Sequence, residues 1–360
     1  MNLSHEQRAL LLDPFDIGSL RVRNRLVMAP MTRNRAVNGI PSEEMVEYYE
    51  RRAEHGIGLI ITEGTYIDTP DAGGVEGVPV LRQGAAADAW SRVVEKVHSK
   101  NAAIFAQLWH IGAALEATSA ISPSGIALDG RLHGRHMTMR DMDRVCSAFA
   151  EAAVLAQSIG FDGVEIHGAH GYLIDQFLWD VTNHRLDEYG GTHPERARFA
   201  ADVVSSVRRE VGPDFPISFR FSQFKVDRYT ARIAETPDQL AALLRPIAAA
   251  GTTIFHASAR RFWEPAFDIS KRTLAGWAKD LTGMPVIAVG SLGLDGAFRG
   301  SDTAGHAPLQ PLVDQFMDDQ FDLVASGRSL LVNPNWVDAF SKGELHKLRT
   351  YRKEYEAEYF

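Results

Sequence analysis

Two histidines and a tyrosine stand close together near the middle of the chain, where they could act on one substrate. His167 and His170 are three residues apart, and Tyr172 follows two residues later. Imidazole N–H groups can stabilise a developing oxyanion, and a tyrosine hydroxyl can deliver a proton. The spacing suggests electrophilic activation of a substrate together with its protonation, although a His-x-x-His pair can also be no more than the polar rim of a loop.

Eight short apolar runs, alternating with amphipathic stretches, must position these residues. Their nearly continuous apolar character is typical of parallel strands that are buried on both faces. The runs span residues 25–29, 58–62, 102–108, 162–167, 216–221, 252–256, 285–289 and 322–325. Helix ends can be read as well: Thr138 and Thr236 predict helix starts, and Gly251 predicts a helix end.

This alternation predicts an α/β fold in which residues 1–360 form a single (β/α)8 TIM barrel. We expect an N-terminal extension before the first strand and capping loops over the barrel, with residues 110–138 capping the substrate. The alternative is an open doubly wound sheet, which would normally carry a glycine-rich phosphate fingerprint after its first strand. Residues 29–32, Ala-Pro-Met-Thr, do not form one.

The composition limits the partners and the compartment. A formal net charge of −8 and a sequence pI of about 5.9 argue against binding to nucleic acid or to an anionic membrane. The single cysteine, Cys146, excludes an internal disulfide framework and a cysteine-ligated iron–sulfur cluster. No run approaches the ~18 apolar residues of a membrane helix. We therefore expect a cytoplasmic protein that acts on a small molecule, as a monomer or a homo-oligomer.

Residues that end the strands of such a barrel converge on one face. Gly290-Ser291 and Gly327-Arg328 follow the last two strands, where many barrels bind phosphate, and Arg328 adds a bidentate cation. Gln107 can pair a donor and an acceptor with a uracil-like edge, and Arg220 can place a positive charge beside it. The set indicates a flat, polar, phosphorylated ligand, unless the two glycines only form tight turns.

With these motifs the chain resembles the Old Yellow Enzyme family of FMN-dependent ene reductases over nearly its whole length. The motifs are NRLVMAPMTR at 24–33, ITEGT at 61–65, QLWH at 107–110 and the stretch at 161–196, which alone is close to diagnostic. The resemblance implies a non-covalent FMN and NADPH or NADH as the reductant. It also implies ping-pong reduction of the activated C=C bond of α,β-unsaturated carbonyls or nitroalkenes.

The resemblance assigns roles to the strand-end residues. His167 and His170 would hold the carbonyl or nitro oxygen of the substrate, and Tyr172 would protonate its Cα. Trp109 would border the substrate, and Thr32 would donate a hydrogen bond to the flavin C4 oxygen. The residues that would bind FMN are Pro30, Met31, Thr32, Gly64, Gln107, Arg220, Gly290, Ser291, Gly327 and Arg328.

The segment after the sixth strand departs from the family because it is bulky and basic. Phe262 and Trp263 could wall the substrate pocket. Arg260 or Arg261 could attract an anionic substrate or the cofactor phosphate, or both could pair with nearby acids such as Glu264 on a solvated surface.

Two other functions are compatible with parts of the sequence. A zinc-dependent barrel hydrolase could draw its ligands from His110, Glu165, His167, His170 and His256. However, no His-x-His follows the first strand. In a strand, Glu165 would also point to the face opposite to that of Val164 and Ile166, so we expect no metal site. A flavin-binding protein without enzymatic activity is the other alternative, and the presence of Tyr172 beside both imidazoles argues against it.

Overall fold

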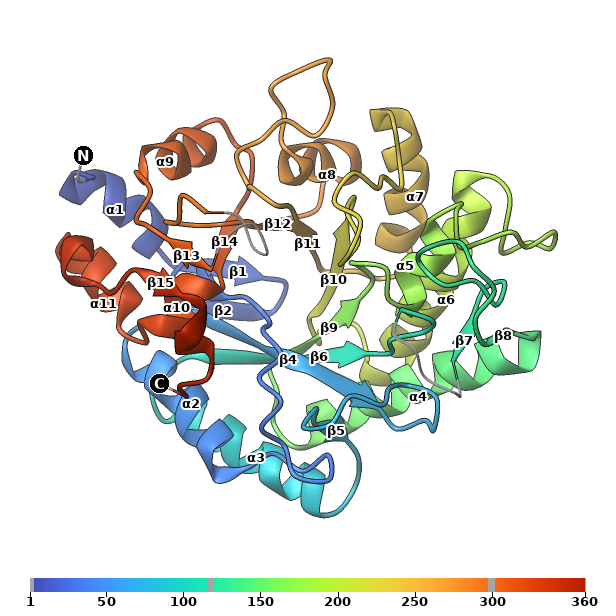
Figure 1. Cartoon of the computed structure of the whole chain (residues 1–360). Coiled ribbons are helices and arrows are strands. Elements are labelled where there is room, and N and C mark those ends of the chain that lie inside the picture. Colours follow the sequence, from blue (N-terminus) through green and yellow to red (C-terminus); the bar gives the residue numbers. More distant parts are fainter. Residues whose placement is uncertain (1–2, 115–119, 297–301, 360) are drawn as a thin grey trace.

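The computed structural model describes residues 3–114, 120–296 and 302–359 of the chain. Within them, eight parallel strands close into a barrel, because β14 pairs with β3. Around the barrel the order is β3 (Leu26–Met28), β4 (Leu59–Ile67), β6 (Ala103–Trp109), β9 (Gly163–His167), β10 (Ile217–Ser222), β11 (Ile254–Ser258), β12 (Val286–Val289) and β14 (Leu323–Ser326). Figure 1 shows these strands in the centre with helices around them. The predicted (β/α)8 barrel is confirmed, and the open-sheet alternative is wrong.

All eight predicted apolar runs are strands, with ends that move by one or two residues except in β4. The register of β4 against β6 shifts between Ile61 and Gly64, and β4 then continues to Ile67. There a short strand, β5 (Val80–Leu81), pairs with it. This irregularity lengthens β4 beyond the predicted run and lets Gly64 lie beside Gln107 of β6.

Helices follow the barrel strands and lie outside them (Figure 1). They are α2 (Glu43–Glu54), α3 (Ala85–His98), α4 (Met139–Ser158), α6 (His193–Val211), α7 (Pro237–Ala249), α8 (Leu274–Thr282), α9 (Gln310–Met317) and α11 (Trp336–Lys342). Two short helices, α5 (Leu173–Leu178) and α10 (Arg328–Val332), begin soon after β9 and β14. The predicted starts at Thr138 and Thr236 are confirmed, because each hydroxyl accepts the backbone N–H three residues later.

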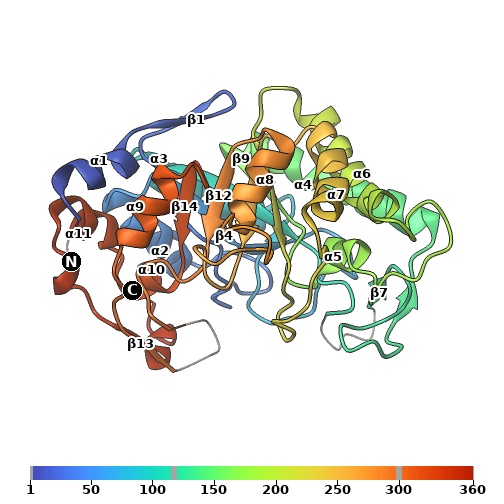
Figure 2. The same ribbon diagram turned by 90° about the horizontal axis from the view of Figure 1, so that it is seen from above.

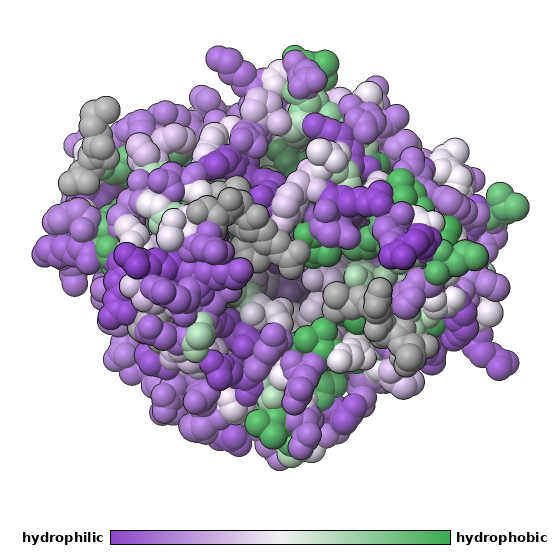
Figure 3. Space-filling view, in the orientation of Figure 1, coloured by the Kyte–Doolittle hydropathy of each residue, from purple (hydrophilic) through white to green (hydrophobic). Residues whose placement is uncertain are grey.

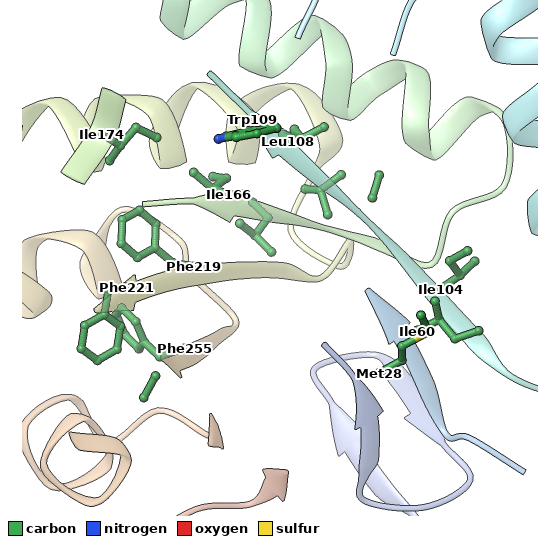
Figure 4. Packing of buried hydrophobic residues seen from close by; sticks show 14 of the residues in the cluster. Met28, Ile60, Ile104, Leu108, Trp109, Ile166, Ile174, Phe219, Phe221 and Phe255 are labelled. Atoms are coloured by element: carbon green, nitrogen blue, oxygen red, sulfur yellow. The ribbon is translucent and has the colours of Figure 1, made fainter. Parts of the chain in front are cut away.

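Apolar side chains fill both sides of the barrel wall. Residues such as Met28, Ile104 and Ile166 pack outward against the helices (Figure 4). A separate inner cluster, which includes Val27, Phe105, Ile254, Ile287 and Leu323, fills the amino-terminal end of the barrel. Because apolar side chains fill the amino-terminal end, inward-facing polar side chains have room only at the carboxyl end of the barrel.

The predicted N-terminal extension closes the plugged end. It consists of α1 (His5–Leu12) and a hairpin of β1 (Phe15–Ile17) and β2 (Leu20–Val22). Ile17 and Val22 of the hairpin join the inner apolar cluster. Figure 2 shows β1 at one end of the barrel and β7 and β13 toward the opposite end, where the strands finish.

The carboxyl end carries the long loops. β7 (Ile121–Ser122) and β8 (Arg135–His136) pair within the predicted capping segment 110–138, of which residues 115–119 lie outside the described residues. Near the chain end, β13 (Thr303–Ala304) pairs with β15 (Tyr351–Arg352). Strand β15 lies in the chain between the 3-10 turns Leu345–Lys347 and Lys353–Glu356. None of the helices in the described part of the chain is both long and apolar enough to span a membrane.

Candidate active site

A pocket of about 540 Å³ opens where the barrel strands end. Figure 3 shows a hollow near the centre of this face. Fourteen of the sixteen predicted site residues line the pocket: Pro30, Met31, Thr32, Gly64, Gln107, Trp109, His167, His170, Tyr172, Arg220, Gly290, Ser291, Gly327 and Arg328. The fold therefore brings together residues that are up to 298 positions apart (Pro30 to Arg328) in the chain.

Four rings make one corner of this pocket. The Tyr172 ring lies 4.8 Å from the His167 ring and 4.9 Å from the Trp109 ring, nearly perpendicular to both. The His170 ring is 5.2 Å from that of His167. Two imidazoles and a phenol thus face the same small volume, as their spacing in the sequence suggests.

Both imidazoles are held as neutral hydrogen-bond donors. Burial, reinforced by the charge of Arg220, keeps the pKa of His167 and of His170 well below the usual value. The Nδ1 atom of His167 accepts the N–H of Ala169 at 3.3 Å, so its proton lies on Nε2. His167 can therefore offer its Nε2–H to a substrate oxygen.

Ser258, which the sequence does not single out, orders the second imidazole. Its Oγ lies 2.8 Å from Nε2 of His170 and accepts a hydrogen bond of 3.3 Å from Arg220. A serine hydroxyl can accept two hydrogen bonds and donate one, so Ser258 can pair with either neutral tautomer of His170. Ser258 thereby connects Arg220 to the His170 ring.

The loop between β9 and α5, which carries His170 and Tyr172, bends sharply and is held by a buried ion pair. His170 and Gly171 have φ values of +65° and +86°. The Gly171 N–H donates to Asp175 at 2.5 Å, and the Asp175 carboxylate pairs with Lys225 at 2.7 Å. Both charged side chains are fully buried. This buried ion pair fixes the loop to the segment after β10.

A buried carboxylate, Glu165 of β9, lies behind the pocket residue Gln107. It accepts hydrogen bonds from Gln107 at 2.9 Å and from Ser218 at 2.8 Å, and lies 2.7 Å from Nδ1 of His256. Burial by itself would raise the pKa of Glu165, but His256 and Arg220 lower it to about 2. The ionised carboxylate holds one N–H of the Gln107 amide and leaves the amide oxygen for a ligand.

The opposite end of the pocket is built for an anion. A Cβ on Gly290 would lie 2.6 Å from the carbonyl oxygen of Ala259, so only glycine fits where the backbone turns. The next residue, Ser291, accepts a hydrogen bond of 3.2 Å from Arg328. Gly327 precedes Arg328 and faces Met31. The two predicted phosphate-binding turns therefore face one another, with a guanidinium between them.

Comparison with known proteins decides the family. The family model described as NADH:flavin oxidoreductase / NADH oxidase family matches residues 10–346. The chain belongs to this family. Its resemblance to Old Yellow Enzyme, predicted from the motifs, is confirmed by solved structures.

The curated relatives of this flavin oxidoreductase differ in how much of the chain they match. The NADH oxidase of Thermoanaerobacter brockii is 33% identical over 350 residues, which are 92% of this chain and 51% of that protein. The 12-oxophytodienoate reductase 7 of Oryza sativa subsp. japonica is 37% identical over 230 residues, 58% of this chain and 57% of that protein. The chain thus spans about half the length of the curated relatives that it matches.

Solved structures match over almost the whole chain. Morphinone reductase in complex with tetrahydroNAD superposes with a TM-score of 0.80 at 27% identity, covering 97% of each chain. Old Yellow Enzyme from Pichia sp. AKU4542 superposes with a TM-score of 0.79 at 25% identity, covering 97% of this chain and 90% of that one.

Two predicted site residues, Phe262 and Trp263, are not part of the pocket lining. Phe262 is buried and packs edge-on against Trp263 and Phe321 at 5.0 and 6.2 Å. Its direction follows from the turn at Gly290, whose carbonyl accepts the Phe262 N–H at 3.1 Å. The side chain is thereby turned into the protein core.

The residues of the zinc alternative serve other contacts. His256 is held by Glu165, and Nε2 of His110 lies 3.4 Å from Asp71. Across the described ranges, no three His, Cys, Asp or Glu side chains lie where they could share a metal ion.

Proposed function

We propose that this chain is an FMN-dependent ene reductase that uses NADH or NADPH to reduce the activated C=C bond of an α,β-unsaturated carbonyl compound or a nitroalkene. The observation that carries the proposal is the corner of His167, His170 and Tyr172, where two neutral imidazoles and a phenol face one volume. Relatives named 12-oxophytodienoate reductase and morphinone reductase support the proposed substrate class. The tetrahydroNAD complex of morphinone reductase supports a nicotinamide reductant.

The residues present fit FMN. Gln107 keeps an amide oxygen and a second N–H for the pyrimidine edge, and the buried Nε–H of Arg220 has no acceptor among the described residues. At the far end, the glycine turns with Ser291 and Arg328 suit a phosphate. The volume of about 540 Å³ lies within the usual range of ligand pockets.

The geometry supports a role for each protein group. Bound FMN would supply the redox chemistry, taking hydride from the nicotinamide and giving it to the alkene carbon Cβ. The N–H groups of His167 and His170 would bind the carbonyl or nitro oxygen and stabilise the charge that grows on it. The hydroxyl of Tyr172 would then give its proton to Cα. Both ligands would use the same corner in turn, which would make the kinetics ping-pong.

Lids and substrate access belong to the same proposal. Leu128, within the predicted capping segment, is buried, and its two Cδ atoms would lie 2.7 and 2.8 Å from a Cβ on Gly171. The part of the segment around Leu128 therefore lies against the loop of His170 and Tyr172. We propose that it covers the substrate side of the pocket.

The visible spectrum of the purified protein tests the function. We expect one FMN per chain after acid release, bleaching of its absorbance by NADH or NADPH without oxygen, and recovery when cyclohexenone is added. Released FAD, or no bound flavin after reconstitution with FMN, would contradict the proposal. A flavin spectrum that no nicotinamide bleaches would instead favour the non-enzymatic alternative.

A further inference from the structure

We propose that Arg260 forms a second oxyanion site on the pocket wall, separate from the phosphate end at Ser291 and Arg328. It would bind a phosphate or carboxylate group of the ligand that enters and leaves during turnover. The proposal rests on the proposed function for the presence of such a ligand.

A row of rings leads from the catalytic corner to Arg260. Phe224 stacks on His170 at 5.0 Å, and Tyr229 packs against Phe224 at 6.1 Å. The Arg260 guanidinium lies over the Tyr229 ring, 3.5 Å from its centroid. His170, Phe224, Tyr229 and Arg260 all line the pocket. A ligand whose reacting end lies against His170 can therefore extend along this wall toward a fixed positive charge.

The Arg260 guanidinium has no carboxylate partner within 4 Å among the residues that the structure describes. Its Nη1 atom is buried and makes no hydrogen bond there. Stacking on Tyr229 holds the group in place without using its N–H donors. A buried donor without an acceptor is costly, and an incoming oxyanion would relieve that cost with a charge-assisted hydrogen bond.

Each of the other charged side chains of the pocket makes at least one hydrogen bond within the described part of the chain. Arg220 donates to Ser258, and Arg328 donates to Ser291 and to the carbonyl of Gly296. Arg33 donates to backbone carbonyls of the C-terminal segment. Glu356, a carboxylate in the lining, accepts a hydrogen bond from Tyr351. Arg33 and Arg220 also keep one buried N–H each, but Arg260 is the pocket guanidinium that donates no hydrogen bond to any of the described residues.

The backbone and the side chain of Arg260 point to different places. Its carbonyl oxygen accepts the Ser291 hydroxyl at 3.1 Å, so the main chain is tied to the phosphate end. Its guanidinium instead reaches Tyr229, in the loop after β10. The guanidinium therefore lies beside the ring row, although its charge also acts on Arg328 at the phosphate end.

Arg261 takes the other of the two roles that the sequence leaves open. Its Nη2 donates to the carbonyl of Asp295 at 2.9 Å, and its Nε lies 3.8 Å from Glu264. Arg261 does not line the pocket. The adjacent arginines therefore divide the roles, and Arg261 provides a matched control.

Two ligands could carry the oxyanion, and paired probes distinguish them. The first pair is tetrahydroNADH, which carries a pyrophosphate, and neutral 1-benzyl-tetrahydronicotinamide, neither of which can transfer hydride. The second pair is cyclohexenone and a cyclohexenone that carries a carboxylate. Dissociation constants of the first pair are measured by calorimetry on the FMN-loaded protein, and kcat/KM of the second pair by steady-state kinetics.

In Arg260→Gln, we expect the preference for the charged member of one pair to fall by about tenfold or more, the scale of a lost charge-assisted hydrogen bond. Loss in the first pair identifies the coenzyme as the source of the oxyanion, and loss in the second identifies the substrate. Arg260→Lys should recover part of the preference, and Arg261→Gln should leave both ratios at the parent value.

Three results would overturn the site. The charged-to-neutral ratios could stay unchanged in Arg260→Gln, they could fall equally in Arg261→Gln, or Arg260→Gln could lose FMN while it still binds riboflavin. The last result would assign Arg260 to the FMN phosphate. An absence of flavin from the parent protein would instead contradict the proposed function, and this result is distinct from the three that overturn the Arg260 site.

Discussion

At the scale of single residues, the position of each proton decides what the pocket can do. His167 and His170 keep a lowered pKa through burial, so each remains a neutral donor at physiological pH. They can stabilise a negative oxygen without giving up a proton. In the proposed mechanism the proton comes from the third member of the corner, Tyr172, whose ring lies 4.8 Å from His167.

Tyr172→Phe separates proton delivery from hydride transfer. We expect reduction of the bound FMN by NADH or NADPH to continue nearly unchanged, because the hydroxyl takes no part in that step. Enone reduction should slow by about 10²-fold or more, the usual scale of general acid catalysis. Stopped-flow absorbance measures the two half-reactions separately, with nitroalkenes as the comparison, since a nitronate can leave unprotonated. Enone turnover at the parent rate would show that another group supplies the proton.

Glu165 illustrates how a residue without substrate contact can adjust the cofactor. Its ionised carboxylate holds Gln107 and faces the charge of Arg220 beneath the proposed pyrimidine site. In Glu165→Gln, the loss of this buried negative charge should favour the more electron-rich reduced FMN. We expect the reduction potential to rise by roughly 30 mV or more, about 1.4 kcal/mol for a two-electron couple.

A potentiometric titration with a reference dye measures this shift. Ser218→Ala is the control, because it removes one hydrogen bond of 2.8 Å to Glu165 and keeps the carboxylate charge, so its shift should be smaller. A potential that stays the same or falls in Glu165→Gln, with FMN still bound, would place the Glu165 charge out of reach of the flavin.

At the scale of elements, a short loop and the start of α5 are held by one buried ion pair. Asp175 binds both the Gly171 N–H and the Lys225 ammonium, and neither charged side chain is exposed. Burial raises the pKa of Asp175 and lowers that of Lys225, so each depends on the other to stay charged. Removal of one partner leaves the other uncompensated, which costs more than removal of both.

We expect Lys225→Met to lower the free energy of unfolding by about 3 kcal/mol or more, with part of it recovered in the double variant Asp175→Asn/Lys225→Met. Chemical denaturation of the two single variants and the double variant gives the coupling energy. Enone turnover should fall further than FMN content in Lys225→Met, since the loop carries Tyr172. Additive losses in the double variant would mean that the two charges do not support one another.

At the scale of the whole molecule, the segment after β3, helix α2 and the chain end meet around one buried carboxylate. Glu63 of β4 accepts the Arg33 N–H at 3.0 Å and lies 3.4 Å from the Tyr49 hydroxyl. Arg33 in turn lies over the Tyr359 ring at 5.2 Å. Burial raises the pKa of Glu63 from 4.5 to about 7, so the folded state keeps a proton that the unfolded state has lost.

This raised pKa makes stability depend on pH in a defined direction. Between pH 4.5 and about 7 the folded protein binds more protons at Glu63 than the unfolded chain, so its contribution to stability falls as the pH rises. In Glu63→Gln the contribution is absent. We compare the free energy of unfolding of Glu63→Gln with that of the parent at the same pH. This difference should shift in favour of the variant by about 3 kcal/mol when the pH is raised from 5 to 8.

Urea denaturation of both proteins at the two pH values measures the difference. The control is Glu47→Gln on the exposed part of α2, whose only ion pair is the 3.9 Å contact with Arg51 among the residues described, and its profile should run parallel to that of the parent. A parallel profile for Glu63→Gln as well would mean that Glu63 titrates alike in the folded and unfolded states.

Local patterns in the sequence predict the architecture and most of the pocket. The eight strands and the caps at Thr138 and Thr236 follow from periodicity and from side-chain-to-backbone hydrogen bonds within a few residues. The pocket residues follow because every parallel strand ends on the same face of the barrel. Each of these patterns lies within one short segment, so the sequence alone is enough to predict them.

The tertiary structure alone decides which side chains touch across strands. Glu165 meets Gln107 and His256, which are 58 and 91 positions away, through the register of β9 with its neighbours. The turn at Gly290 directs Phe262 into the core and leaves Arg260 on Tyr229. Apolar and charged residues in one short segment can satisfy several environments equally well. Only closure of the barrel, which places distant strand ends side by side, selects one of them.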